Sequence, residues 1–145
     1  MTNLRACEFH ADSEGEMMAL GERLAAELAG GGVIIMLSGE LGAGKTTLVR
    51  GMLRGLGFEG RVKSPSYGLV ESYKAGDLDI HHLDLYRLGD PEELDFIGIE
   101  DLVGRASMLL VEWPERGRGR LPDASARIRI EDSGTGRRVW LESLI

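Results

Sequence analysis

A short run of residues in the first third of the chain has a spacing that could bind the phosphates of a nucleotide. Residues 39–46, GELGAGKT, fit the pattern G-x-x-x-x-G-K-[ST]. Glycines let the backbone adopt positive φ and approach an anion, toward which backbone N–H groups and a helix N-terminus then point. Lys45 can bridge the β- and γ-phosphates, and the Thr46 hydroxyl can bind Mg²⁺. The predicted nucleotide-binding residues of this stretch are Gly39, Leu41, Gly42, Ala43, Gly44, Lys45, Thr46 and Thr47.

The nucleotide is expected to be ATP. Recognition of guanine by GTPases uses an Asn-Lys-x-Asp element, and the only asparagine of this chain is Asn3. A small-molecule kinase is an alternative, but such kinases need an arginine-rich lid and an acceptor pocket. The arginines here cluster late, at Arg116, Arg118 and Arg120, and 145 residues leave little room for either part. A molecular switch or a partner-driven ATPase fits this length better.

Two carboxylates at the ends of predicted strands could complete such a site. The apolar run 107–112 delivers Glu112 to its C-terminal end, the edge where ligands bind in open α/β sheets. Glu112 could hold Mg²⁺ directly or through water. In the segment 82–87, an extended backbone places His82, Asp84 and Tyr86 on one face. Asp84 could orient water, and His82 could be either a packed, hydrogen-bonded histidine or a catalytic one. Asp84 and Glu112 are therefore the predicted catalytic residues, and Thr46 and Glu112 the predicted metal ligands.

The spacing of apolar residues predicts helices that alternate with strands. Ser13 and Glu16 form a capping-box pattern ahead of a helix over 13–29, and no element is predicted before it. Asp90-Pro91 is typical of another helix start. This pattern predicts a three-layer α/β fold like that of P-loop NTPases, with a mostly parallel central sheet and a C-terminal antiparallel hairpin, as one ATPase domain over 1–145. The other predicted elements are strands at 33–37, 67–73, 78–84, 107–112, 125–131 and 139–144, and a helix over 46–56.

Composition limits the possible functions. The single cysteine excludes a disulfide framework, and the net charge of −7 argues against coating of DNA or RNA through phosphate contacts. No apolar run is long enough to span a membrane, so the cytoplasm is the expected compartment. Residues 116–145 are basic, with seven Lys or Arg against four Asp or Glu. This segment is predicted either to contact an RNA or protein partner, or to be a solvated hairpin.

Several motifs together resemble the TsaE family of bacterial tRNA threonylcarbamoyladenosine biosynthesis proteins. The resemblance covers about residues 20 to 140 and includes motifs more specific than the glycine-rich one. In order, the motifs are GELGAGKTT at 39–47, KSPSY at 63–67, HLDLYR at 82–87, DPEEL at 90–94 and VEWPE at 111–115.

The resemblance implies a cytoplasmic ATPase that is weak alone and acts with the TsaB–TsaD heterodimer. That assembly, supplied by TsaC with threonylcarbamoyl-adenylate, modifies the adenosine next to the anticodon of tRNA, and hydrolysis of ATP resets it between cycles. tRNA itself would be an indirect or weak partner. A binding module whose hydrolysis is incidental is the alternative.

The resemblance also assigns roles to particular residues. Asp84 would support hydrolysis, and Ser66 would belong to a mobile switch at 64–67 near the γ-phosphate. Trp113 would lie beside the nucleotide, and Arg137 would close over it. Met17 stands where the family often has Ser or Thr near the adenine, which leaves the adenine contacts of residues 13–17 open.

Overall fold

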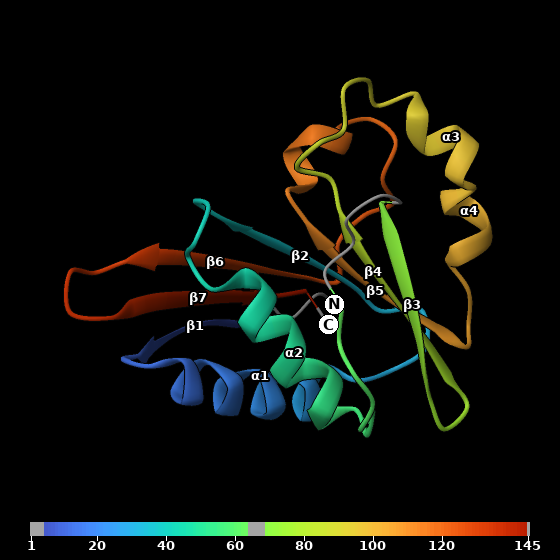
Figure 1. The fold of residues 1–145 in the computed structure, drawn as a ribbon. Helices are drawn as coiled ribbons and strands as arrows, with labels where there is room; N and C mark the ends of the chain where they lie inside the picture. Colours follow the sequence, from blue (N-terminus) through green and yellow to red (C-terminus); the bar gives the residue numbers. More distant parts are fainter. Residues whose placement is uncertain (1–4, 64–68, 145) are drawn as a thin grey trace.

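The computed structural model describes residues 5–63 and 69–144, and within them helices and strands alternate along most of the chain (Figure 1). None of the described helices combines the length and the apolar character that crossing a membrane requires. The strands are β1 Arg5–Ala11, β2 Ile34–Gly39, β3 Val70–Ala75, β4 Leu78–Asp84, β5 Ser107–Glu112, β6 Ala126–Asp132 and β7 Arg137–Ser143; the helices are α1 Glu14–Leu28, α2 Lys45–Gly55, α3 Glu93–Ile97, α4 Ile99–Leu102 and the 3-10 helix η1 Pro114–Gly117.

The strands form a single mixed sheet in the order β1-β7-β6-β2-β5-β4-β3. The pairs β6–β2, β2–β5 and β5–β4 are parallel, whereas β1–β7, β7–β6 and β4–β3 are antiparallel. The α/β fold and the C-terminal hairpin are confirmed, but the prediction of a mostly parallel sheet is wrong. The unpredicted strand β1 adds an antiparallel edge, and only Gly76 and Asp77 separate β3 from β4. A two-residue connection can join antiparallel strands but not parallel ones.

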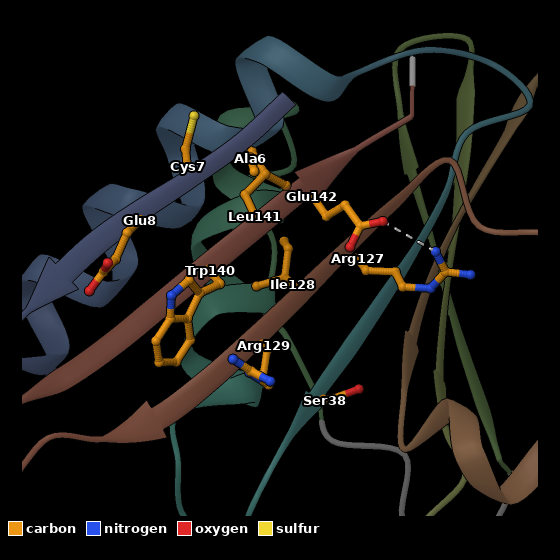
Figure 2. A pocket seen from close by; sticks show the side chains of 10 residues that line it. All are labelled: Ala6, Cys7, Glu8, Ser38, Arg127, Ile128, Arg129, Trp140, Leu141 and Glu142. Atoms are coloured by element: carbon orange, nitrogen blue, oxygen red, sulfur yellow. Dashed lines mark ion pairs between the residues drawn. The ribbon is translucent and has the colours of Figure 1, made fainter. Parts of the chain in front are cut away.

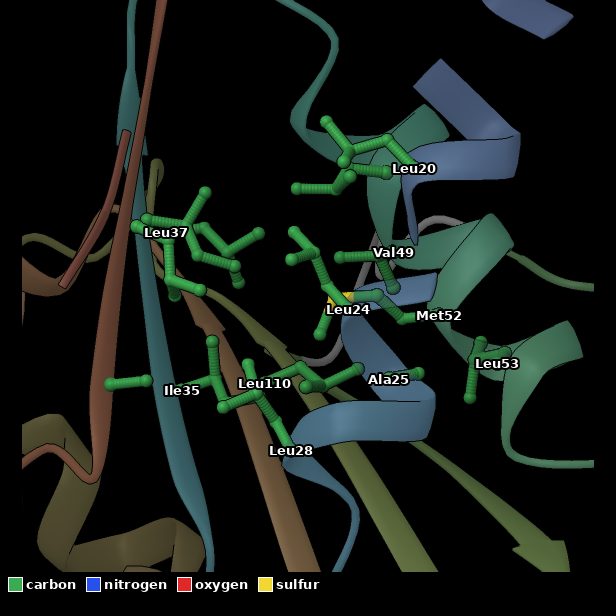
Figure 3. Close-up of a cluster of buried hydrophobic side chains, with 14 of the residues drawn as sticks. Leu20, Leu24, Ala25, Leu28, Ile35, Leu37, Val49, Met52, Leu53 and Leu110 are labelled. Carbon is green, nitrogen blue, oxygen red and sulfur yellow. The ribbon is translucent and has the colours of Figure 1, made fainter. Parts of the chain in front are cut away.

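Helices α1 and α2 cover one face of the sheet and bury the larger apolar cluster. Figure 3 shows Leu24 of α1 and Met52 of α2 between the two helices and the side chains of Ile35 in β2 and Leu110 in β5. All four side chains are fully buried. Burial of a side chain of this size contributes about 1.5–3 kcal/mol, so this layer holds the strands against the helix that follows the glycine-rich segment.

A second apolar cluster lies on the opposite face of the same strands. Side chains alternate along a strand, so Ile34 and Leu109 face away from α1 and α2. They pack in the cluster that contains Leu94 of α3 and Ile99 of α4. The expected three layers are therefore present over β2, β5 and β4.

Glycines allow α1 and α2 to approach closely. A Cβ atom on Gly51 of α2 would lie 2.2 Å from the carbonyl oxygen of Met18, and one on Gly21 of α1 would lie 2.4 Å from that of Leu48. Both distances are shorter than any ordinary carbon–oxygen contact. The helices can cross at this separation only because neither position carries a side chain.

The predicted helix ends agree with the structure at one helix and differ at another. Ser13 is the N-cap of α1, where its Oγ accepts a hydrogen bond of 3.1 Å from the N–H of Glu16. Helix α3 begins at Glu93, later than the predicted start at Asp90. Asp90 instead accepts from the N–H of Glu92 at 2.9 Å and stabilises a turn ahead of the helix. The strand predicted at 67–73 begins within the described residues at Val70; residues 67 and 68 lie outside them.

Candidate nucleotide-binding site

The segment between β2 and α2, residues 40–44 and called here the glycine loop, leaves the start of α2 open to a ligand. Gly42 and Gly44 have φ of 78° and 109°, a region that favours glycine. Helix α2 has no side-chain cap and no acidic residue in its first turn. Helix α1, by contrast, is capped by Ser13 and has two glutamates there. The N–H groups at the start of α2 therefore suit an external anion.

Lys45, the first residue of α2, is buried beside this loop. Its Nζ donates a hydrogen bond of 2.5 Å to the carbonyl oxygen of Gly39 and lies 3.5 Å from the centre of the Trp113 ring. Burial lowers the pKa of the Lys45 ammonium, and the nearby carboxylates of Glu112 and Asp84 oppose this effect. The ammonium is thus fixed at the helix N-terminus, where a cation and N–H groups can bind phosphate together.

Glu112 ends β5 at the same edge of the sheet and is almost completely buried. Its Oε2 atom lies 2.5 Å from His82 Nε2 and accepts a longer hydrogen bond, 3.5 Å, from Thr46 Oγ1. The other ring nitrogen of His82, Nδ1, is buried and has no hydrogen-bond partner among the described residues. This arrangement makes Nε2 the donor and fixes the orientation of the carboxylate.

The oxygens of Thr46 and Glu112 fit a magnesium ion that binds with a nucleotide. Mg²⁺ prefers oxygen ligands and is usually held by one or two protein groups, with water and phosphate oxygens completing its shell. No group of three or more His, Cys, Asp or Glu side chains is arranged for a metal in residues 5–63 and 69–144. The donor set therefore suits a cation shared with phosphates better than one held by the protein alone.

Asp84 lies beside Glu112 because β4 and β5 pair in parallel, with the two residues in register. Burial raises the pKa of Asp84; the N–H of Tyr86, which donates to Oδ1 at 3.1 Å, lowers it, and the charge of Glu112 raises it further. Asp84 and Glu112 thus form a pair of carboxylates at the C-terminal edge of the sheet, as the sequence predicted.

Replacing Asp84 by asparagine is expected to raise the melting temperature by about 2 °C near pH 7. Because its pKa is higher in the folded protein than in the unfolded chain, the ionised carboxylate costs stability above its unfolded pKa, and asparagine removes that cost while keeping the acceptor for Tyr86. The gain should shrink as the pH falls toward about 4, where the unfolded carboxyl group also takes up a proton. Thermal unfolding of the wild type and of Asp84→Asn, at a series of pH values from about 4 to about 7, measures this difference in melting temperature. An asparagine variant that is less stable at neutral pH would contradict the expectation.

Trp113 follows Glu112 and has a backbone conformation unusual for a large residue. Its φ of 57° is the only positive φ outside glycine in the described part of the chain. This conformation turns the indole toward Lys45 and Tyr86, and the Tyr86 and Trp113 ring centres are 5.0 Å apart. The guanidinium of Arg116 lies over both rings, at 5.3 and 5.8 Å. Trp113 therefore forms a wall of the site, held by contacts that the motifs did not reveal.

Two cavities meet at the glycine loop. One, of about 320 Å³, is lined by Lys45, Thr46, Asp84, Glu112 and Trp113. The other, of about 220 Å³, lies at the start of α1 and is lined by residues 11–14 and Met17. Both are lined by Gly42, Gly44, Thr47 and Glu14. The first contains the cation and carboxylates suited to phosphates and a metal; the second could hold the rest of a nucleotide.

The structure brings most of the predicted site residues together. Leu41 belongs to the first cavity and is strongly exposed, while Ala43 and Arg137 line the second. Met17 also lines the second cavity, so the start of α1 does border the site. Ser66 and the rest of the predicted switch at 64–67 lie outside the described residues. Glu14 belongs to the segment 13–17, whose contacts the sequence left open, and the fold brings it next to the loop, where it lines both cavities.

A further cavity, of about 580 Å³, lies on the open face of β1, β7 and β6 and is lined by none of residues 40–44 (Figure 2). Trp140 lines it, and the guanidinium of Arg129 lies over the Trp140 ring, 4.5 Å from its centre. The arginines of this face are paired: Arg127 with Glu142 at 3.8 Å, Arg129 with Glu131 at 3.4 Å and Arg138 with Glu8 at 3.0 Å. The basic charge predicted to meet tRNA or a protein partner is thus largely balanced on this face.

The fold and the site define an α/β protein in which the glycine loop between β2 and α2 lies beside two carboxylates, Asp84 at the end of β4 and Glu112 at the end of β5. Residues 11–139 match the family model described as threonylcarbamoyl adenosine biosynthesis protein TsaE. The chain therefore belongs to the TsaE family of tRNA threonylcarbamoyladenosine biosynthesis proteins, which confirms the resemblance seen in its motifs.

Individual relatives agree with this assignment. The chain is 50% identical to the Haemophilus influenzae tRNA threonylcarbamoyladenosine biosynthesis protein TsaE over 109 residues, which are 75% of this chain and 69% of the relative. It is 34% identical to the Bacillus subtilis protein of the same name over 116 residues, 80% of this chain and 72% of the relative. The crystal structure of Bacillus subtilis YdiB superposes with a TM-score of 0.78 at 30% identity, covering 99% of this chain and 88% of YdiB.

Proposed function

We propose that this chain, acting as one domain, binds ATP with Mg²⁺ and hydrolyses it slowly, and that its hydrolysis supports the TsaB–TsaD complex in the threonylcarbamoyl modification of tRNA. Lys45 and the N–H groups at the start of α2 bind the phosphates, Thr46 and Glu112 hold the metal ion, and Asp84 orients the attacking water. The ion lowers the charge of the phosphates and polarises the bond that breaks. We expect the chain to act in the cytoplasm, where TsaB–TsaD and tRNA would be available to it.

The convergence of Lys45, Thr46 and Glu112 at an uncapped helix N-terminus carries this proposal. Each of these residues has a separate chemical task in phosphoryl transfer, and the fold places them within one cavity. The fixed carboxylate of Glu112 matters most, because a helix N-terminus alone would bind an anion without promoting its hydrolysis.

The proposal is tested by reconstituting tRNA modification from TsaB, TsaC, TsaD, tRNA and ATP, with and without this chain. Phosphate release should be slow for the chain alone and rise when TsaB–TsaD is added. Replacing Glu112 by glutamine should reduce stimulated hydrolysis about a hundredfold or more and abolish support of modification, because a neutral amide is a poor magnesium ligand. Glu131→Gln, on the open sheet face, is the matched control and should behave like the wild type.

Three outcomes would contradict the proposal. Rapid hydrolysis that does not depend on the partner would argue against a role tied to TsaB–TsaD. Transfer of the γ-phosphate to a metabolite, in place of free phosphate, would identify a kinase. A hydrolysis-deficient Asp84→Ala variant that still binds ATP and fully supports modification would favour a binding module.

A further inference from the structure

Arg137, the first residue of β7, makes two hydrogen bonds to the glycine loop. Its Nε donates to the carbonyl oxygen of Ala43 at 3.1 Å and its Nη2 to that of Gly42 at 3.4 Å. Its Nη1 donates to the carbonyl oxygen of Gly136 at 3.3 Å and pairs with Asp132 Oδ2 at 3.3 Å. The side chain therefore connects the C-terminal hairpin to a loop 94 residues earlier in the chain.

These contacts determine how two peptide groups of the loop are turned. The C=O and N–H of one planar peptide point in opposite directions. Because Arg137 holds the Ala43 carbonyl, the N–H of Gly44 points away from the arginine. The preceding peptide is held at both ends, since Arg137 binds the Gly42 carbonyl while the Ala43 N–H donates to the backbone carbonyl oxygen of Glu40 at 3.0 Å. Gly44 is the N-cap of α2, so its N–H belongs to the group suited to an anion.

The hairpin that presents Arg137 is itself held in place. Asp132 and Arg137 face each other across the β6–β7 turn, and their ion pair joins its two sides. A Cβ atom on Gly136 would lie 2.3 Å from Asp12 Oδ1, so the turn packs directly against the junction of β1 and α1. Arg137 is thus anchored at its base and cannot follow the loop freely.

We propose that Arg137 is a positioning residue that sets the peptide orientation of the glycine loop and thereby its affinity for a polyphosphate. It acts through the backbone of Gly42 and Ala43 and not on the nucleotide itself. The proposal rests on the proposed function for the identity of the ligand, and it differs from the role that the family resemblance implies, in which Arg137 closes over the nucleotide.

The test compares the binding of ATP, ADP and inorganic tripolyphosphate to the wild type and to Arg137→Met, by titration calorimetry. All three affinities should fall by a similar factor, about tenfold, because the same loop N–H groups bind each ligand. In ATP hydrolysis, the substitution should raise KM by a larger factor than it lowers kcat. Arg137→Lys should restore only part of the affinity, since a lysine keeps the charge but has a single donor nitrogen in place of the planar fork that reaches the two carbonyls from Nε and Nη2.

Contact with the nucleoside would give a different result, with weaker binding of ATP and ADP and unchanged binding of tripolyphosphate, and this outcome would overturn the proposal. The matched control is Arg129→Met, which removes an ion-paired arginine on the open face of β6 and should leave all three affinities unchanged. Melting temperatures of the variants verify that each is folded.

A second measurement uses the protein without any ligand. In Arg137→Met, the amide NMR signals of Gly44 and Lys45 should shift and their hydrogens should exchange faster, whereas contact only with bound nucleotide predicts no change. Unchanged signals would overturn the proposal. If the wild type bound neither ATP nor tripolyphosphate, the proposed function would fail, while this measurement would still decide whether Arg137 holds the loop.

Discussion

Replacing Lys45 by methionine is expected to reduce ATP hydrolysis about a thousandfold, the scale seen when a preorganised charge on a transferred phosphoryl group is lost. Methionine has a similar length and no charge, so it fills the space beside Trp113 without replacing the ammonium. The ammonium is preorganised by burial and by its hydrogen bond to Gly39. Such a charge contributes more to the transition state than a mobile lysine on the surface would, because little reorganisation is needed during the reaction.

Single-turnover phosphate release at saturating ATP measures this loss separately from binding. The matched control is Lys74→Met on β3, which removes an exposed lysine 3.8 Å from Asp79 and should leave the rate unchanged. A Lys45→Met protein that keeps its rate within tenfold would show that the ammonium does not contact the phosphoryl group being transferred. Because burial of the charge is itself costly, the variant should be at least as stable as the wild type.

Replacing Gly51 by alanine is expected to lower the free energy of unfolding by about 2–3 kcal/mol, a large effect for one methyl group. The new Cβ atom would meet the backbone of Met18 in α1 at 2.2 Å, and backbone cannot move aside as a flexible side chain can. The two helices would have to separate, which would loosen the apolar cluster beneath them. The better helix propensity of alanine, about 1 kcal/mol, offsets only part of this cost.

Gly15→Ala in α1 is the matched control, because the nearest atom to its new Cβ would be Ser13 Oγ at 3.8 Å. There the same substitution should be neutral or stabilise the protein by up to about 1 kcal/mol. Urea denaturation of the two variants and the wild type gives the comparison. If Gly51→Ala were as stable as Gly15→Ala, the close crossing of α1 and α2 would not be required for stability.

Replacing Gly51 should also weaken ATP binding, because the glycine loop is joined to the start of α2.

Local patterns in the sequence were sufficient to predict the helices and strands that surround the site. Ser13 and Glu16 lie within one helical turn, so the start of α1 is decided by residues that are close in the chain. The same holds for the apolar run that ends at Glu112 and for the glycines ahead of Lys45. Contacts between near neighbours form in whichever tertiary arrangement the chain adopts, which is why their patterns can be recognised before the fold is known.

Strand β1 and the contacts of Arg137 and His82 could not be predicted without knowledge of the whole fold. The segment Arg5–Ala11 becomes a strand because β7, more than a hundred residues later, offers it an unpaired edge. Arg137 reaches the glycine loop across 94 residues, and His82 meets Glu112 only because β4 and β5 pair in register. The sequence by itself predicted which residues could bind phosphate and metal. The tertiary structure decided what holds them in place, because strand pairing and side-chain contacts between distant segments depend on the global packing and leave no local pattern.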